Sequence, residues 1–256
     1  MNLTEEQILQ NWNDLIQVID DNFEGERQAK LKSLYEHFQE RMMFAPASGI
    51  EHFHNSWPGG YVDHVLRVCK AAKHTYDLWK HMGSNMEGYT YEELMFCALN
   101  HDLGKVGDIN HEYYVPNQSE WHRKNQGKIY DPNPNIQHMT VPHRGIWLLS
   151  NYGITFSQNE MIGILTHDGV YDSGNDAYLK PYGKEKALWN NLPIVLHHAD
   201  HMASRIEYEN WKGKSRVTKA FANNPKPYTK KPKISTGNDN ASDLFKDLFG
   251  ETKWFG

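Results

Sequence analysis

The chain has few cysteines, no long apolar run and no excess of positive charge. Its two cysteines, Cys69 and Cys97, lie in segments with a helical pattern, where an isolated cysteine is usually a small buried apolar side chain. We therefore expect no disulfide and a reducing, cytoplasmic location. No apolar stretch approaches the roughly 18 residues of a membrane span, so we expect no membrane segment. The first residues have neither a basic segment nor an apolar run, and we expect no signal peptide.

The balance of charge argues against a protein that coats nucleic acid. The 256 residues carry 27 Lys and Arg against 32 Asp and Glu, a net charge of −5, whereas proteins that bind phosphate backbones broadly are usually basic. The length allows one good-sized core or two small ones. The sequence has neither strand-like alternation nor an internal repeat, so its pattern indicates an all-α protein.

Helical periodicity runs through most of the chain. Capping boxes at Thr4, Thr90 and Ser157 each predict the start of a helix. The helix after Thr90 should end in the pair His101-Asp102, and the helix after Ser157 should lead to His167. Four further helices are expected at 26–43, 61–80, 142–151 and 185–211. We interpret residues 1–45 as an N-terminal helical extension and 46–211 as the main domain.

Two segments depart from this pattern. Residues 107–140 show no periodicity, and a loop of this length inside a compact domain is often a lid or a substrate wall. Residues 212–242 form a basic and then polar linker, and 243–256 form a short apolar-acidic tail that we expect to be flexible. The paired Leu-Phe steps within 243–255 resemble peptides that dock into a hydrophobic groove of a protein partner, such as that of a sliding clamp. The alternative is a terminal helix that packs back on the domain.

The most informative segment is Asn100-His101-Asp102-Leu103-Gly104-Lys105. It places an imidazole, a carboxylate and a cation within about one helical turn. His101 shares a helical face with Leu94 and Cys97, so it points toward the core, where a buried ligand must lie. Six nitrogen and oxygen donors are then available for metals: His64, His101, Asp102, His143, His167 and Asp200.

Such a set can hold two divalent metals that hydrolyse phosphate esters. Imidazoles and carboxylates suit Mn, Fe, Zn or Ni, and two metals about 4 Å apart can share a hydroxide nucleophile and stabilise the leaving oxygen. We assign Asp102 the bridging, catalytic role. The first metal would be held with His64, His101 and Asp200, and the second with His143 and His167. For the last two the alternative is a contact with substrate or support of a single metal.

Several cations and histidines near this set are candidates for binding substrate. Lys105, one turn after Asp102, is placed to meet a substrate phosphate as a point charge and to act in catalysis. Arg144 and Arg205 are candidates for phosphate binding, although an arginine beside a helix end is more often a surface charge. His122 and His138, both within 107–140, are candidate substrate contacts.

These motifs resemble those of the HD-domain metal-dependent phosphohydrolase superfamily, whose pattern is His, then His-Asp, then Asp, with two intervening histidines in its dinuclear branches. The resemblance covers about residues 45–210. The segments Ala45-Pro46-Ala47, His54-Asn55 and Gly59-Gly60-Tyr61-Val62-Asp63-His64 are similar to the branch that contains 3′–5′ exoribonucleases. Thr166-His167-Asp168-Gly169 and His198-Ala199-Asp200 follow the same branch.

The resemblance implies an HD-domain helical bundle and an enzyme of the phosphodiesterase or nucleotidase type. Those exoribonucleases carry an OB-type nucleic-acid module, whereas about 45 helical residues stand before the domain here, and the 107–140 segment is longer than usual. Both departures favour a small phosphorylated substrate, a nucleotide above all. Two alternatives remain: a di-iron oxygenase with the same six ligands, and a metal-stabilised binding module that acts through its tail.

Overall fold

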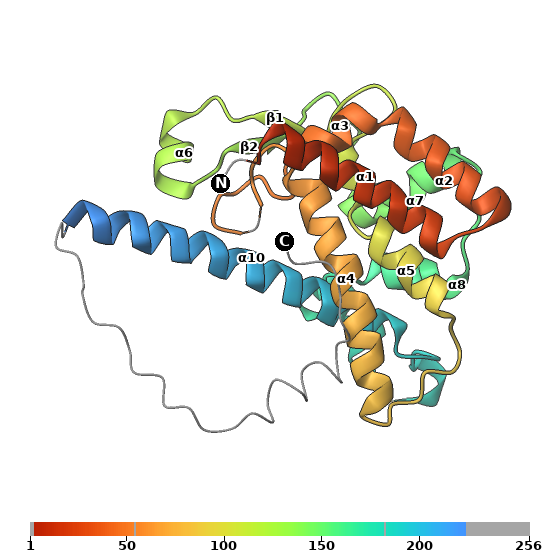
Figure 1. The fold of residues 1–256 in the computed structure, drawn as a ribbon. Helices are drawn as coiled ribbons and strands as arrows, with labels where there is room; N and C mark the ends of the chain where they lie inside the picture. The colour runs from red at the N-terminus through yellow and green to blue at the C-terminus, as the bar shows by residue number, and fades with distance from the viewer. Residues whose placement is uncertain (1–2, 54, 182, 224–256) are drawn as a thin grey trace, which may run out of the picture. The chain divides into compact units, whose positions relative to one another are not determined.

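The structure is a computed structural model that describes residues 3–53, 55–181 and 183–223. The chain is mostly helical, which confirms the predicted all-α class (Figure 1). It divides into two units, Met1–Val217 and Thr218–Gly256, and everything described below lies in the first, apart from the last residues of α10. The predicted tail at 243–255 and the linker beyond Asn223 lie outside the described residues.

Ten α-helices and four short 3-10 helices occur in the described residues. The α-helices are α1 Glu5–Asn22, α2 Gly25–His37, α3 Gln39–Phe44, α4 Gly60–His81, α5 Tyr91–Asn100, α6 Glu120–Gln126, α7 Val141–Asn151, α8 Gln158–Leu165, α9 Asp176–Leu179 and α10 Leu192–Asn223. The 3-10 helices are η1 Leu103–Val106, η2 Gly169–Tyr171, η3 Ser173–Asn175 and η4 Lys184–Lys186.

The three predicted capping boxes are confirmed. The hydroxyls of Thr4, Thr90 and Ser157 each accept a hydrogen bond from the backbone N–H of the third helical residue, whose side-chain oxygen in turn accepts from the backbone N–H of the cap residue. Pro142 stands at the start of α7, where its missing N–H is not needed. These helix starts are therefore determined by local chemistry.

Two predicted helix boundaries are wrong. The helix expected at 26–43 is interrupted at Phe38, whose ψ of 13° separates α2 from α3. Its ring is buried against that of Tyr152, with centroids 6.0 Å apart, so packing rather than a helix breaker bends the chain here. The last helix begins at Leu192 instead of 185, because the side chain of Asn190 accepts from the Leu192 backbone at 3.1 Å. It then continues through 212–223, before Pro225.

The 107–140 segment contains a small hairpin that the sequence does not predict. Strand β1 (Tyr114–Pro116) pairs antiparallel with β2 (Tyr130–Pro132), with Val115 opposite Asp131 and α6 in the connection. Strands of three residues are too short for alternation to be recognised. A bridge between Ile50 and Lys128 ties this segment to the loop before α4.

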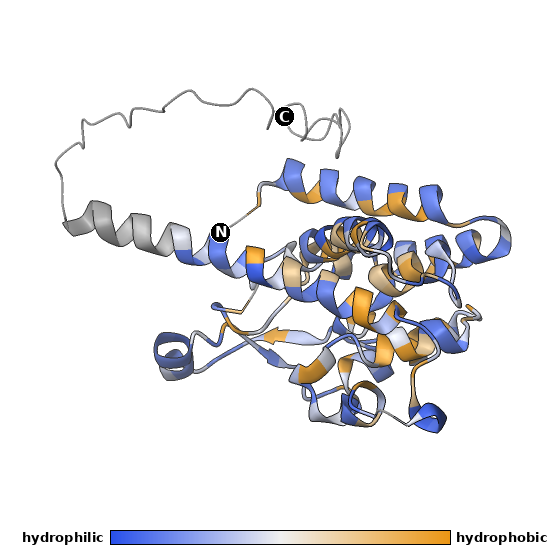
Figure 2. Cartoon of the chain, turned by 90° about the horizontal axis from the view of Figure 1, so that it is seen from below, coloured by the Kyte–Doolittle hydropathy of each residue, from blue (hydrophilic) through white to orange (hydrophobic). Residues whose placement is uncertain are grey.

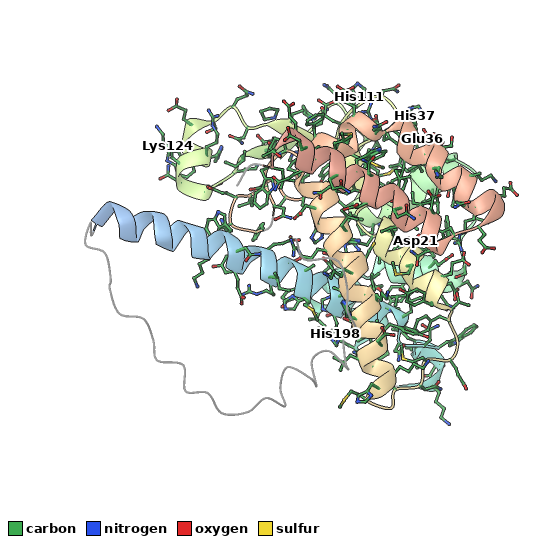
Figure 3. All side chains as sticks on the ribbon, viewed as in Figure 1. Asp21, Glu36, His37, His111, Lys124 and His198 are labelled. Atoms are coloured by element: carbon green, nitrogen blue, oxygen red, sulfur yellow. The ribbon has the colours of Figure 1, made fainter. Side chains whose placement is uncertain are left out.

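The core lies between the apolar faces of α1, α2, α4, α5 and α10. Figure 2 shows hydrophobic positions alternating with hydrophilic ones along the helices, and Leu15, Leu34, Val65, Leu99 and Leu196 are fully buried. Helix α10 passes α4 near His198, whose ring centroid lies 5.5 Å from that of Trp79 (Figure 3). No helix in the described part of the chain has the length and apolarity to cross a membrane.

Candidate metal centre

Five of the six predicted donors come together from four elements. His64 lies on α4, His101 and Asp102 follow α5, His167 follows α8, and Asp200 lies on α10. The first four are almost fully buried, and the side chain of Asp200 is 15% exposed. A cluster of charged and polar side chains this deep requires compensation, either by mutual contacts or by a bound ion.

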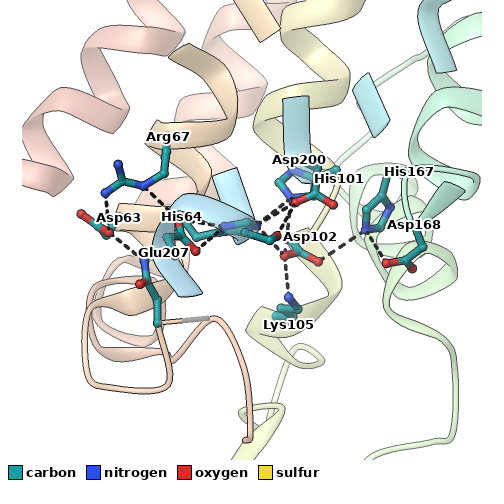
Figure 4. A network of polar contacts seen from close by, with 12 residues as sticks. Asp63, His64, Arg67, His101, Asp102, Lys105, His167, Asp168, Asp200 and Glu207 are labelled. Carbon is teal, nitrogen blue, oxygen red and sulfur yellow. Dashed lines mark hydrogen bonds and ion pairs between the residues drawn. The ribbon is translucent and has the colours of Figure 1, made fainter. Parts of the chain in front are cut away.

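The carboxylate of Asp102 faces imidazoles on two sides. Its Oδ2 lies 3.5 Å from Nε2 of His101 and 3.6 Å from Nε2 of His64, whereas its Oδ1 lies 3.7 Å from Nε2 of His167. Asp200 closes the first side, with Oδ1 3.2 Å from Nε2 of His64 (Figure 4). One carboxylate thus separates two groups of donors.

The three buried imidazoles all present Nε2 to this point because their Nδ1 atoms are occupied. Nδ1 of His101 lies 2.8 Å from the carbonyl oxygen of Ala98, and Nδ1 of His167 lies 2.8 Å from that of Ile164. A carbonyl oxygen can only accept, so each Nδ1 carries the proton and each Nε2 keeps a lone pair in the neutral ring. Nδ1 of His64 faces the carboxylate of Glu207 at 3.1 Å. A metal-binding histidine has this arrangement.

The donors fit a divalent metal by type and by spacing. Three overlapping groups have ligand atoms within 4.8 Å of one another. They are His64 with His101 and Asp200, His101 with Asp102 and His167, and His167 with Asp168 and Asp200. Imidazole and carboxylate without thiolate suit first-row divalent metals such as Mn, Fe, Zn and Ni.

Electrostatics keep the carboxylates of the centre ionised. Burial alone would raise the pKa of Asp102, but the charges of Lys105 and His101 hold it well below its usual range. Burial likewise opposes ionisation of Asp200, but the hydrogen bond from His64 and the nearby imidazoles lower its pKa. Burial would lower the pKa of His64, yet Glu207 and Asp200 raise it to about 10. The ionised carboxylates are therefore balanced by Lys105 and by a proton on His64, and a metal would bind in place of that proton.

Lys105 belongs to the same centre. Its Nζ lies 2.6 Å from Oδ2 of Asp102, and its side chain is 12% exposed. Burial would lower its pKa, but Asp102 raises it, so the amine stays charged. The approach of α7 to η1 requires Gly104, because a Cβ there would lie 2.0 Å from the carbonyl oxygen of Val141. This explains the small residue between Asp102 and Lys105.

His143 is not brought into the centre. It is exposed in the first turn of α7, where its Nδ1 lies 2.6 Å from the hydroxyl of Thr140, and it belongs to none of the donor groups found among the described residues. The side chain at this position turns outward because Thr140 caps the helix and engages the ring. Its role as a ligand stays a prediction.

The predicted substrate contacts divide into two sets. A cavity of about 780 Å³ opens over the centre, and Lys105 and Arg205 line it. Within the described chain, His122, His138 and Arg144 do not line this cavity. Arg144 is buried, donates to the carbonyl oxygen of Gln137 at 2.7 Å and lies over the ring of Tyr113, so it supports the 107–140 segment.

Glu207 is the residue that sequence reasoning missed. It is 2% exposed and accepts from Arg67 Nε at 3.0 Å as well as contacting His64. Arg67 in turn lies 3.4 Å from Asp63, which continues the network away from the centre (Figure 4). A signal was available, because Glu207 stands seven residues after Asp200 and so on the same helical face. Asp168 joins the centre too, 3.7 Å from His167.

His197 fixes the backbone that carries His167. Its Nδ1 lies 2.9 Å from the carbonyl oxygen of His167. Gly169 has a φ of +59°, and a Cβ there would lie 2.3 Å from the ring of His197. Only glycine accommodates both the left-handed backbone and the adjacent ring.

Comparisons of the chain with family models, with curated proteins and with solved structures found no match.

Proposed function

We propose that this chain is a metal-dependent phosphohydrolase of the HD-domain type, with two divalent metal ions and a nucleotide-like phosphate ester as substrate. One observation carries the proposal: the two oxygens of Asp102 face separate buried imidazoles, each with its Nε2 directed to the same centre. A shared carboxylate between two nitrogen-donor groups is what a dinuclear hydrolase requires.

The donor groups suggest how two ions are held. His64, His101 and Asp200 would hold one, and His167 and Asp168 would contribute to the other, with Asp102 between them. The residues that carry the resemblance to HD-domain enzymes are far apart in the sequence, and their convergence supports this family. When bound, such metals polarise a phosphoryl oxygen and lower the pKa of water.

The other residues of the site position and balance the substrate. Lys105 holds a positive charge beside Asp102, where it can contact a phosphoryl oxygen once a metal takes over the carboxylate. Arg205 offers a second cation on the cavity wall. The cavity, at about 780 Å³, falls in the size range of about 300–1,000 Å³ typical of small-molecule sites and is far larger than a phosphate group alone needs.

The test is hydrolysis by Mn-loaded protein of nucleoside mono-, cyclic and triphosphates and of short oligonucleotides. Asp102→Asn should lose both activity and bound metal, because the shared carboxylate becomes a neutral amide. The matched control is Asp21→Asn, an exposed carboxylate at the end of α1 (Figure 3). No turnover by metal-replete protein, or an Asp102→Asn variant that stays active, would overturn the proposal. Iron retention with oxygen uptake would favour the di-iron oxygenase.

A further inference from the structure

One wall of the cavity consists of rings and a cation that the metal centre does not use. We call it the α10 rim, and it consists of Tyr171, His197, His201, Arg205 and Tyr208, which all line the cavity. The four members on α10 recur at intervals of four, four and three residues, so they form one stripe along the helix. This stripe runs for about 16 Å at 1.5 Å per residue, beside the stripe that carries Asp200.

The rings of the rim are already arranged for stacking. Tyr171 stacks on His201 with centroids 5.2 Å apart and planes inclined by 24°. His197 lies 6.0 Å from His201 at 32°, and the guanidinium of Arg205 lies over the ring of Tyr208 at 4.9 Å. Tyr171 is 72% exposed, so one face of its ring is open to a further planar group.

The rim is held rigidly next to the metal centre. His197 is fixed by the carbonyl oxygen of His167 and by the space that Gly169 leaves. Tyr171 follows directly on this turn, at the end of η2. The rim itself carries no acidic side chain, and its Arg205 favours an anionic ligand.

We infer that the α10 rim binds the base of a nucleotide by stacking on Tyr171, with the scissile phosphate at the metal centre and Arg205 on a neighbouring phosphate or the sugar. This inference rests on the proposed function and adds the surface that recognises the base of the nucleotide. Aromatic and histidine rings stack on all bases, so the rim selects for a base without choosing among bases. A free mononucleotide and the end of a single strand share this chemistry.

The experiment compares kcat/KM for a nucleoside 5′-monophosphate with that for ribose 5-phosphate, which lacks a base. In Tyr171→Ala the ratio of the two kcat/KM values, nucleotide over ribose 5-phosphate, should fall by about 5- to 150-fold. This is the range expected when one base loses its stacking partner. Tyr171→Phe should restore the ratio because it keeps the ring. Tyr178→Ala, which removes an exposed tyrosine on α9 away from this cavity, should keep the wild-type ratio.

A trinucleotide distinguishes the two sources of the ligand. If kcat/KM is higher for the trinucleotide than for the monophosphate, and Arg205→Ala removes that preference, the ligand is a strand end. If kcat/KM is higher for the monophosphate, the ligand is a free nucleotide. Equal use of nucleotide and ribose 5-phosphate by the wild type overturns the inference and leaves the proposed hydrolase intact.

A binding measurement tests the α10 rim even if the proposed hydrolase activity is not found. If no substrate is hydrolysed, whether to inorganic phosphate or to a shorter nucleotide product, calorimetric titration with a nucleoside decides. Saturable binding that Tyr171→Ala weakens supports the rim, and no binding, or equal binding by the variant, overturns it.

Discussion

His64 differs from His101 and His167, the other two histidines of the cluster, in what holds its ring. His101 and His167 each bond a carbonyl oxygen three residues earlier in their own segment, whereas His64 depends on Glu207 from another helix. A carboxylate on Nδ1 orients the ring and makes Nε2 a stronger donor. Glu207 is therefore a positioning residue for the proposed metal centre.

Glu207→Gln should lower the affinity for Mn²⁺ by about 10- to 100-fold, as found when such supporting partners are lost. The amide keeps the size of the side chain but removes its charge from His64 and Arg67. Competition with a chromogenic chelator measures the affinity. Glu209→Gln, an exposed position two residues later, is the control. Equal affinities in the two variants would mean that Glu207 has no part in metal binding.

Gly169 also acts at the scale of one residue. Gly169→Ala should destabilise the fold by about 1–3 kcal/mol more than Gly25→Ala, because overpacking adds to the cost of a left-handed backbone. Both glycines have a φ of +59°, but no atom of the described residues lies within 4 Å of a Cβ at Gly25, whereas the His197 ring lies at 2.3 Å from one at Gly169. Urea unfolding measures both. Equal losses would show that the ring of His197 moves aside freely.

At the scale of elements, helix α10 contributes side chains to three parts of the site. It supplies Asp200 to the centre, Glu207 to His64, and most of the α10 rim to the cavity wall. The end of α5 is fixed separately. The hydroxyl of Tyr35 on α2 lies 3.0 Å from the carbonyl oxygen of Leu99 and 3.2 Å from the side-chain oxygen of Asn100. This contact holds the turn that presents His101.

Tyr35→Phe should therefore destabilise the protein by about 1–3 kcal/mol, since it leaves buried acceptors without their donor. Tyr89→Phe is the matched control, because the Tyr89 hydroxyl is buried with no hydrogen-bond partner among the described residues, and its removal should be neutral or stabilising. Denaturant unfolding compares the two. A Tyr35→Phe protein as stable as the Tyr89→Phe protein would argue against this link between α2 and α5.

At the scale of the whole molecule, the features that the sequence predicts are those set by residues close together in the chain. Helix starts with a side-chain cap, at Thr4, Thr90 and Ser157, are confirmed because the signal and the contact lie within four residues. The inward direction of His101 follows from helical periodicity. The break at Phe38 depends on a ring from elsewhere in the fold and leaves no local signal.

The same limit applies to the site. Glu207 contacts His64 only because α10 passes α4 in the fold. Its spacing from Asp200 therefore indicates a role in the site only when the position of His64 on the facing helix is known. The outward direction of His143 depends on the cap at Thr140 and on how α7 meets η1. The donor types and the grouping of His64, His101 and Asp200 are predicted from the sequence, whereas the place of Glu207 beside His64 required the fold.

The central claim is that the buried His–Asp cluster binds divalent metal through a shared Asp102. The most direct measurement is Mn²⁺ titration of chelator-treated protein, with the metal content of the product determined by mass spectrometry. We predict two ions per chain for the wild type and loss of metal in Asp102→Asn, with Asp21→Asn binding as the wild type does. A wild type that binds no metal, or an Asp102→Asn protein that binds it undiminished, would contradict the account.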